Sequence, residues 1–175
     1  DHNTSEKYYF KSNESLPKPK IVRKREKGII YSVSSWGGYF YIHTNKGAED
    51  FKIERSRDIE ASKWEVFIPA KNETMIGGLT FLKNWIIRSE LNNALDKIFV
   101  RDINSNKEEE LIFTDEEVYD GSISHTQKDR NTDLIYISYS TPKTQARTYL
   151  YNIKTKEKKL VKEQVIPTGH DPKNY

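Results

Sequence analysis

Three stretches of the chain share one pattern of apolar and polar positions: an apolar strand, a short polar turn and a second alternating strand. They run over 39–55, 85–102 and 134–153, and aligning Ile42, Ile87 and Ile137 spaces the units 45 and 50 residues apart. A repeat of about this length, with four short strands in each unit, is typical of β-propeller blades. We therefore predict an all-β fold: a partial β-propeller of antiparallel four-stranded blades, about three complete and part of another.

The alternation also predicts where each blade begins and ends. Ile29, Tyr31 and Val33 alternate with serines, as on a strand with one buried face. We predict an incomplete blade over 1–27, with strands at 7–12 and 21–25, and at most one helical turn, at 58–62. Complete blades are predicted over 28–70, 71–114 and 115–164, with strands at 29–34, 40–44, 51–55 and 64–68, then 79–82, 85–90, 97–103 and 110–113, then 120–124, 134–140, 147–153 and 158–162.

The length fits only part of a closed propeller. At about 45 residues per blade, 175 residues hold three blades and part of a fourth, whereas propellers usually close with four to eight. The chain also starts at Asp1, in mid-pattern, rather than at Met. We expect it to be a piece of something larger.

Composition excludes several classes of protein. The chain has no cysteine, which rules out disulfides and cysteine zinc sites and fits a reducing compartment, so we expect a cytoplasmic protein. No apolar run is long enough to span a membrane, and the N-terminus lacks a signal-peptide core. A net charge of +3, from 29 basic and 26 acidic residues, gives no general drive toward nucleic acid.

Several segments resemble a known family. The run 23–33, the strand 39–45, the segment Trp64-Glu65-Val66-Phe67-Ile68-Pro69, and the C-terminal runs 139–142 and 165–175 resemble, in order, the propeller domain of oligopeptidase B, in the prolyl oligopeptidase family of serine peptidases. The resemblance implies a seven-bladed propeller that caps an α/β-hydrolase domain, where the catalytic Ser, Asp and His all lie. This chain would supply the later blades, with 165–175 as a linker toward a hydrolase domain absent from it.

Direct inspection of the residues predicts no catalytic, cofactor-binding or metal-binding residue. The eight glycines, at 28, 37, 38, 47, 77, 78, 121 and 169, never flank a serine as G-x-S-x-G, the turn that exposes a hydrolase nucleophile. Four isolated histidines, His2, His43, His125 and His170, show no HExxH spacing, and we interpret His43 as a packed strand residue.

Charged and aromatic clusters have structural interpretations that we favour. The runs 108–110 and 115–117 could form an acidic patch for a cation, but neighbouring carboxylates on a strand point to opposite faces, and a solvated loop is favoured. A basic stretch between residues 18 and 27 favours an exposed outer strand over a nucleic-acid site. The eleven tyrosines and three tryptophans favour packing between blades over a ligand groove. The basic stretch comprises Lys18, Lys20, Arg23, Lys24, Arg25 and Lys27.

The resemblance implies a function in gating. In the intact enzyme the propeller covers the active site, admits short peptides with basic residues and excludes folded proteins. The alternatives are a stand-alone peptide- or protein-interaction module and, less favoured, a glycan-binding or carboxylate-based hydrolase. We also expect the chain alone to self-associate through two uncovered apolar faces, one of them around Tyr136, Tyr149 and Tyr151.

Overall fold

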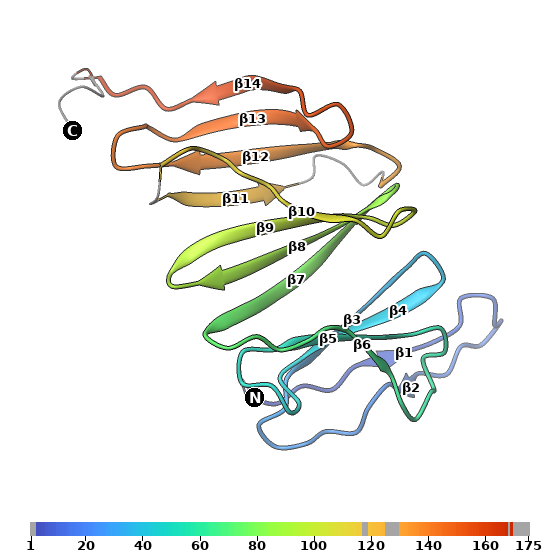
Figure 1. Ribbon diagram of the computed structural model, residues 1–175. Coiled ribbons are helices and arrows are strands. Elements are labelled where there is room, and N and C mark those ends of the chain that lie inside the picture. Colours follow the sequence, from blue (N-terminus) through green and yellow to red (C-terminus); the bar gives the residue numbers. More distant parts are fainter. Residues whose placement is uncertain (1–2, 117–118, 125–129, 168, 170–175) are drawn as a thin grey trace. The chain divides into compact units, whose positions relative to one another are not determined.

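The computed structural model describes residues 3–116, 119–124, 130–167 and 169, and the regular structure in them is β-strand throughout. The strands form three four-stranded antiparallel sheets and one two-stranded sheet (Figure 1). The predicted all-β class, a partial propeller of four-stranded blades, is confirmed. The chain divides into two compact units, residues 1–77 and 78–175, and each is described by itself.

The first unit holds the two-stranded sheet and one complete sheet, in which each strand pairs with the next along the chain. Two glycines at the β3–β4 turn, Gly37 and Gly38, both have positive φ, 57° and 77°, which is the signature of the tightest hairpin connection. The strands are β1 (Tyr8–Tyr9), β2 (Lys20–Ile21), β3 (Tyr31–Trp36), β4 (Tyr39–Thr44), β5 (Lys52–Ser56) and β6 (Glu65–Ile68).

The second unit holds two complete sheets, side by side in Figure 1, with the same strand order. Strand β7 begins in the last residues of the first unit. The strands are β7 (Thr74–Leu82), β8 (Trp85–Asn92), β9 (Leu95–Asp102) and β10 (Glu108–Glu110), then β11 (Asp120–Ser124), β12 (Leu134–Ser140), β13 (Arg147–Asn152) and β14 (Lys158–Glu163).

Three local predictions for the first unit need correction. The strands expected at 7–12 and 21–25 shrink to the two-residue β1 and β2. Residues 58–62 form a hydrogen-bonded turn, in which Ala61 N donates to Asp58 O (3.3 Å), rather than helix. In β6 a register shift opposite Ile53 and Glu54 breaks the alternation, so Val66 is exposed while Ile68 is buried. A bulge of this kind cannot be read from a period of two.

The alignment of the three second strands is wrong by one residue. Ile42, Arg88 and Ile137 are each the fourth residue of β4, β8 and β12, so the register equivalent of Ile42 is Arg88, not Ile87. Ile87 and Ile137 share one core between their two sheets. Because successive side chains on a strand point to opposite faces, Arg88 lies on the other face of its sheet.

A core between the two sheets holds the second unit together. It contains Leu82, Ile87, Ile98, Val100, Leu111, Phe113, Ile135, Ile137, Tyr139, Tyr151 and Ile153, with Tyr149 packed against it. The expected uncovered face therefore needs correction, because Tyr151 belongs to this core and Tyr149 packs against it. Tyr136 pairs with Leu150 and lies on the opposite face of β12. Trp85 Nε1 also donates to Asp133 Oδ1 (2.7 Å), which joins the two sheets at one end.

The β9–β10 and β13–β14 turns repeat the same construction. Asp102 Oδ1 accepts from the Asn104 N–H (2.8 Å), and Asn152 Oδ1 accepts from the Lys154 N–H (3.0 Å). Each side chain thus satisfies backbone donors that the turn leaves unpaired. This repeat of an Asp or Asn at the end of the third strand supports the interpretation of the two sheets as successive blades.

Candidate functional site

A polar cavity of about 450 Å³ lies between the two sheets of the second unit. The first strands of both sheets, β7 and β11, form much of its wall with small residues, and Asp96 and Asp120 add carboxylates where β9 and β11 begin. The lining comprises Gly78, Leu79, Thr80, Ile87, Ser89, Asp96, Ile98, Asp120, Gly121, Ser122 and Ile123. The sequence reasoning missed this site, since its members come from four strands.

Close packing positions the β11 side of the cavity. A Cβ at Gly121 would meet the Tyr119 ring at 3.0 Å and the Phe113 ring at 3.1 Å, so only glycine fits without rearrangement. Tyr119 donates its hydroxyl to Asp96 O (2.8 Å) and thereby links β9 to the start of β11. Burial, followed by the charges of Glu110 and Asp96, raises the pKa of Tyr119 above its ordinary value, so this hydroxyl remains a donor at neutral pH.

The cavity is suited to binding rather than to covalent catalysis. Ser89, Ser122 and Thr80 offer hydroxyls, but no histidine among the described residues of this unit lines the cavity. A serine without a neighbouring base is a weak nucleophile. The two aspartates and three hydroxyls can accept hydrogen bonds from a cationic or amide group.

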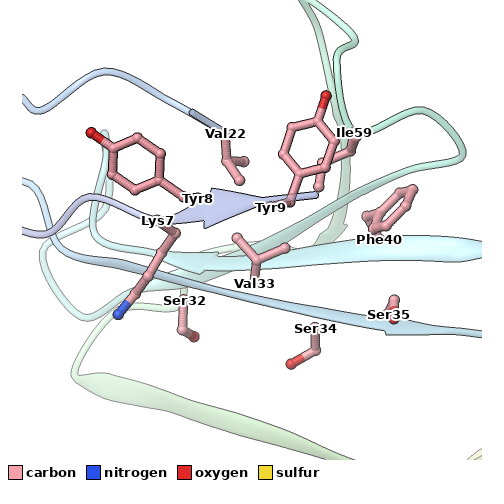
Figure 2. Close-up of a pocket in the computed structure, with 10 residues that line it drawn as sticks. All are labelled: Lys7, Tyr8, Tyr9, Val22, Ser32, Val33, Ser34, Ser35, Phe40 and Ile59. Carbon is pink, nitrogen blue, oxygen red and sulfur yellow. The ribbon is translucent and has the colours of Figure 1, made fainter. Parts of the chain in front are cut away.

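A second cavity, also of about 450 Å³, lies in the first unit between the β1–β2 sheet and β3–β4. Figure 2 shows Val33 and Phe40 on the side that faces Tyr9 and Ile59, while Ser32 and Ser34 point the other way. Tyr8, at 60% exposure, adds an open aromatic wall. Tyr8, Tyr9 and Phe40 thus line a cavity, whereas Tyr139 and Tyr151 pack in the core between two sheets.

A buried ionic network occupies the face of β8–β10 opposite the core. Arg88, only 3% exposed, donates Nε to Glu90 Oε1 (2.8 Å) and makes a bidentate pair with Glu108 (2.8 and 3.0 Å). Arg101 Nε also donates to Glu108 Oε2 (2.9 Å), and Phe99 stacks against Arg88 with the guanidinium 4.6 Å from the ring centroid. Two cations thus balance two carboxylates.

The same network sets the ionisation of Glu108. Burial pushes its pKa upward, but hydrogen bonds and charge from Arg88 and Arg101 outweigh burial and hold the pKa below the ordinary value of 4.5. Glu108 therefore remains ionised at neutral pH. The pattern of apolar positions does not reveal the network, because the predicted alignment puts Ile87 rather than Arg88 at this register position.

The acidic run 108–110 is a strand with paired charges, not the predicted solvated loop. Glu109 pairs with Lys156 across the two sheets, and Glu110 lies 3.8 Å from Lys97. In the second run Glu116 accepts from the hydroxyls of Thr141 (2.9 Å) and Thr144 (3.3 Å), whereas Glu117 lies outside the described residues. Glu108, Glu109, Glu110 and Glu116 thus have partners inside the fold.

His43 occupies a packing position. Its Nε2 donates to Ile76 O (2.7 Å) and its ring stacks on Phe51, with centroids 4.6 Å apart. Burial lowers its pKa, although the bond to Ile76 opposes the shift, so the ring is neutral at pH 7. The other three histidines, His2, His125 and His170, lie outside the described residues.

The basic stretch forms ion pairs rather than a continuous charged strand. Lys20 pairs with Glu60 (2.9 Å), Arg23 with Glu54 (3.0 Å), and Arg25 with Glu6 (3.4 Å). Of its six residues only Lys20 is in a strand, β2, so the predicted outer strand is wrong beyond β2.

Within the described residues, no group of three His, Cys, Asp or Glu side chains could hold a metal ion. No helix there is long and apolar enough to cross a membrane.

Comparison with known proteins gives a consistent family. The sequence matches the family described as prolyl oligopeptidase, N-terminal beta-propeller domain, over residues 1–164. Dipeptidyl aminopeptidase BI of Pseudoxanthomonas mexicana is 27% identical over 158 residues, which cover 89% of this chain and 21% of the relative. The chain thus spans about a fifth of that relative's length.

Solved structures share the fold. Oligopeptidase B from Trypanosoma brucei, in a closed form with covalently bound antipain, aligns with a TM-score of 0.85 at 23% identity and covers 98% of this chain and 26% of that chain. Oligopeptidase B from Leishmania major aligns with a TM-score of 0.80 at 18% identity, over 98% of this chain and 26% of that one.

Proposed function

Because the chain belongs to the N-terminal β-propeller domain family of prolyl oligopeptidases, we propose that it supplies blades of the propeller that covers a serine-peptidase domain and admits only short peptides. The family match over residues 1–164 is the observation that carries the proposal. The contribution is steric and electrostatic, since the sequence has no G-x-S-x-G turn and supplies no activated nucleophile. We place the enzyme in the cytoplasm, in keeping with a sequence without cysteine.

The polar cavity of the second unit supports an electrostatic part in this role. Asp96 and Asp120 add two carboxylates to a cavity whose other polar groups are hydroxyls and backbone. Peptides with basic residues, the substrates that the resemblance to oligopeptidase B implies, would be attracted to such a surface. The partner of the blades in this proposal is the hydrolase domain of the same parent protein.

A chimaera tests the gating role. Residues 1–164 would replace the corresponding blades of an oligopeptidase B, and hydrolysis of a short Arg-ending peptide amide would be compared with that of a folded protein. We expect the peptide to be cleaved and the folded protein to resist. Equal rates on both substrates would contradict gating. The variant D96N/D120N should raise KM for the basic peptide about twofold to threefold at low salt and leave a neutral peptide unchanged.

The alternative function is a stand-alone module that binds a peptide or protein. The open apolar cavity beside Tyr8 and Tyr9 is the observation that favours it. The neighbouring coding sequence separates the two proposals. A reading frame that continues past Tyr175 into G-x-S-x-G, then Asp and His, supports the peptidase, whereas a stop codon supports the module.

We also propose that the chain alone self-associates. The face of the last sheet that carries Leu134, Tyr136 and Leu150 lies opposite the core of the second unit, and its side chains are half-buried. Apolar sheet faces and exposed strand edges favour association. Light scattering across a dilution series should show dimers or larger species, and a monodisperse monomer at high concentration would contradict the proposal.

A further inference from the structure

Two arginines of the first unit lie against one aromatic ring. The guanidinium of Arg57 is 4.3 Å from the centroid of the Tyr39 ring, and that of Arg55 is 4.7 Å from the same centroid. Arg55 also lies 4.7 Å from the centroid of Phe67. The two arginines lie beside the β3–β4 turn, where Gly38 has a φ of 77° and a Cβ would make an ordinary contact, at 3.8 Å, with Arg57 Nη1.

The charges at this place do not balance. Arg55 Nε pairs with Glu65 Oε1 at 2.5 Å. Arg57 and Lys63, by contrast, have no ion-pair partner among the residues that the structure describes. Two guanidinium groups on one ring repel each other, and the face of the tyrosine ring offsets only part of that repulsion. An anion that contacts both arginines would remove the rest.

A cavity opens at the same place. It has a volume of about 300 Å³, and three cations and one carboxylate lie in its wall. Its lining comprises Tyr39, Arg55, Ser56, Arg57, Lys63 and Glu65. Tyr39 begins β4, Arg55 and Ser56 end β5, and Glu65 begins β6, so the sheet positions Arg55. Arg57 directly follows the last residue of β5, and Lys63 lies in the loop before β6.

We propose that this cavity binds an oxyanion, namely the carboxylate of a peptide, either its C-terminus or an acidic side chain. Guanidinium groups bind planar carboxylates through two parallel hydrogen bonds, and stacking on Tyr39 holds Arg57 in place before the ligand arrives. The ion pair with Glu65 takes up part of the hydrogen-bonding capacity of Arg55. A ligand must therefore also contact Arg57. The site is independent of the polar cavity with Asp96 and Asp120 and goes beyond the proposed gating role.

Binding of a labelled peptide to the chain tests the site. The probe is acetyl-Ala-Ala-Glu-Glu with a free C-terminus. Its binding is followed by fluorescence polarisation at low and at physiological salt. The uncharged control peptide has Gln in place of Glu and an amidated C-terminus. We expect R57Q to weaken binding of the acidic probe about fivefold and K63Q about twofold, with weaker binding at higher salt. The uncharged probe should not bind measurably.

The matched control is R147Q. Arg147 pairs with Glu163 (2.6 Å) between two neighbouring strands, as Arg55 does with Glu65, but it is not in the lining of the cavity beside Tyr39. R147Q should bind the acidic probe as the unchanged chain does, and circular dichroism should show that each variant is folded. Equal affinities for R57Q and R147Q would overturn the proposal. Binding of inorganic phosphate without binding of the acidic peptide would overturn the assignment to a peptide carboxylate.

Discussion

The neighbouring sheets of the second unit fill one register position in opposite ways. Ile137, the fourth residue of β12, is 2% exposed within an apolar core, whereas Arg88, the fourth residue of β8, is 3% exposed within an ionic network. Both positions are buried, so burial alone does not decide which type of residue a blade uses. Arg88 is tolerated because Glu90 and Glu108 neutralise it and accept its hydrogen bonds.

Removal of Arg88 should have the largest effect on stability and should show most clearly how the two sheets differ. R88A leaves Glu90 buried and Glu108 half-buried without their main cation, so we expect a loss of about 3–5 kcal/mol in the free energy of unfolding. The control R147A removes an exposed pair and should cost at most about 1 kcal/mol. Urea unfolding followed by circular dichroism measures both. Similar losses for the two variants would show that the network is not effectively buried.

Replacing the ionic network by uncharged residues should give β8–β10 the kind of buried face that the neighbouring sheet has. R88M/E90L/E108Q removes the arginine together with both carboxylate charges, and we expect it to be about 2 kcal/mol more stable than R88A, because no carboxylate is left buried without a cation. Arg101, with 20% of its side chain exposed, keeps its hydrogen bond to Asn106 Oδ1. The same unfolding experiment applies. A triple variant as unstable as R88A would mean that the position needs the shape of arginine, not its neutralisation.

Acid should weaken the network selectively. The folded pKa of Glu108 is lower than its ordinary value of 4.5, so the network contributes stability above that pH and loses it as the pH falls through the folded pKa. E108Q has no carboxyl to titrate at this position and should show a shallower loss of stability below pH 4.5 than the unchanged chain. Parallel curves of stability against pH would refute this assignment.

A turn beside the network offers the smallest effect. Asn93 and Ala94 join β8 to β9 with φ of 50° and 60°, a region that disfavours residues with a Cβ. A94G should stabilise the chain by about 0.5–1 kcal/mol, because glycine adopts this conformation freely. G38A, at a φ of 77° in the equivalent position of the β3–β4 turn, should lose a similar amount. The thermal midpoints of the two variants should move in opposite directions.

The repeat and the blade count could be predicted from the sequence because strand alternation and turn residues are local signals. The family resemblance rests instead on particular segments, such as 64–69. The burial of Arg88 could not be predicted, since an arginine can replace an isoleucine only where Glu90 and Glu108 contact it in the folded chain. The bulge in β6 also reversed the face of Val66 without a mark in the pattern. The polar cavity combines residues of four strands, and the cavity beside Tyr39 depends on two arginines that stack on one ring.

We expect this chain to contribute propeller blades and no serine nucleophile, because its sequence has no G-x-S-x-G turn. Incubation of the chain alone with a serine-directed phosphonate, followed by intact-mass spectrometry, tests it most directly, with an intact oligopeptidase B as the positive control. We predict no covalent adduct on the chain and no turnover of an Arg- or Lys-ending amide reporter. A stoichiometric adduct would contradict the account.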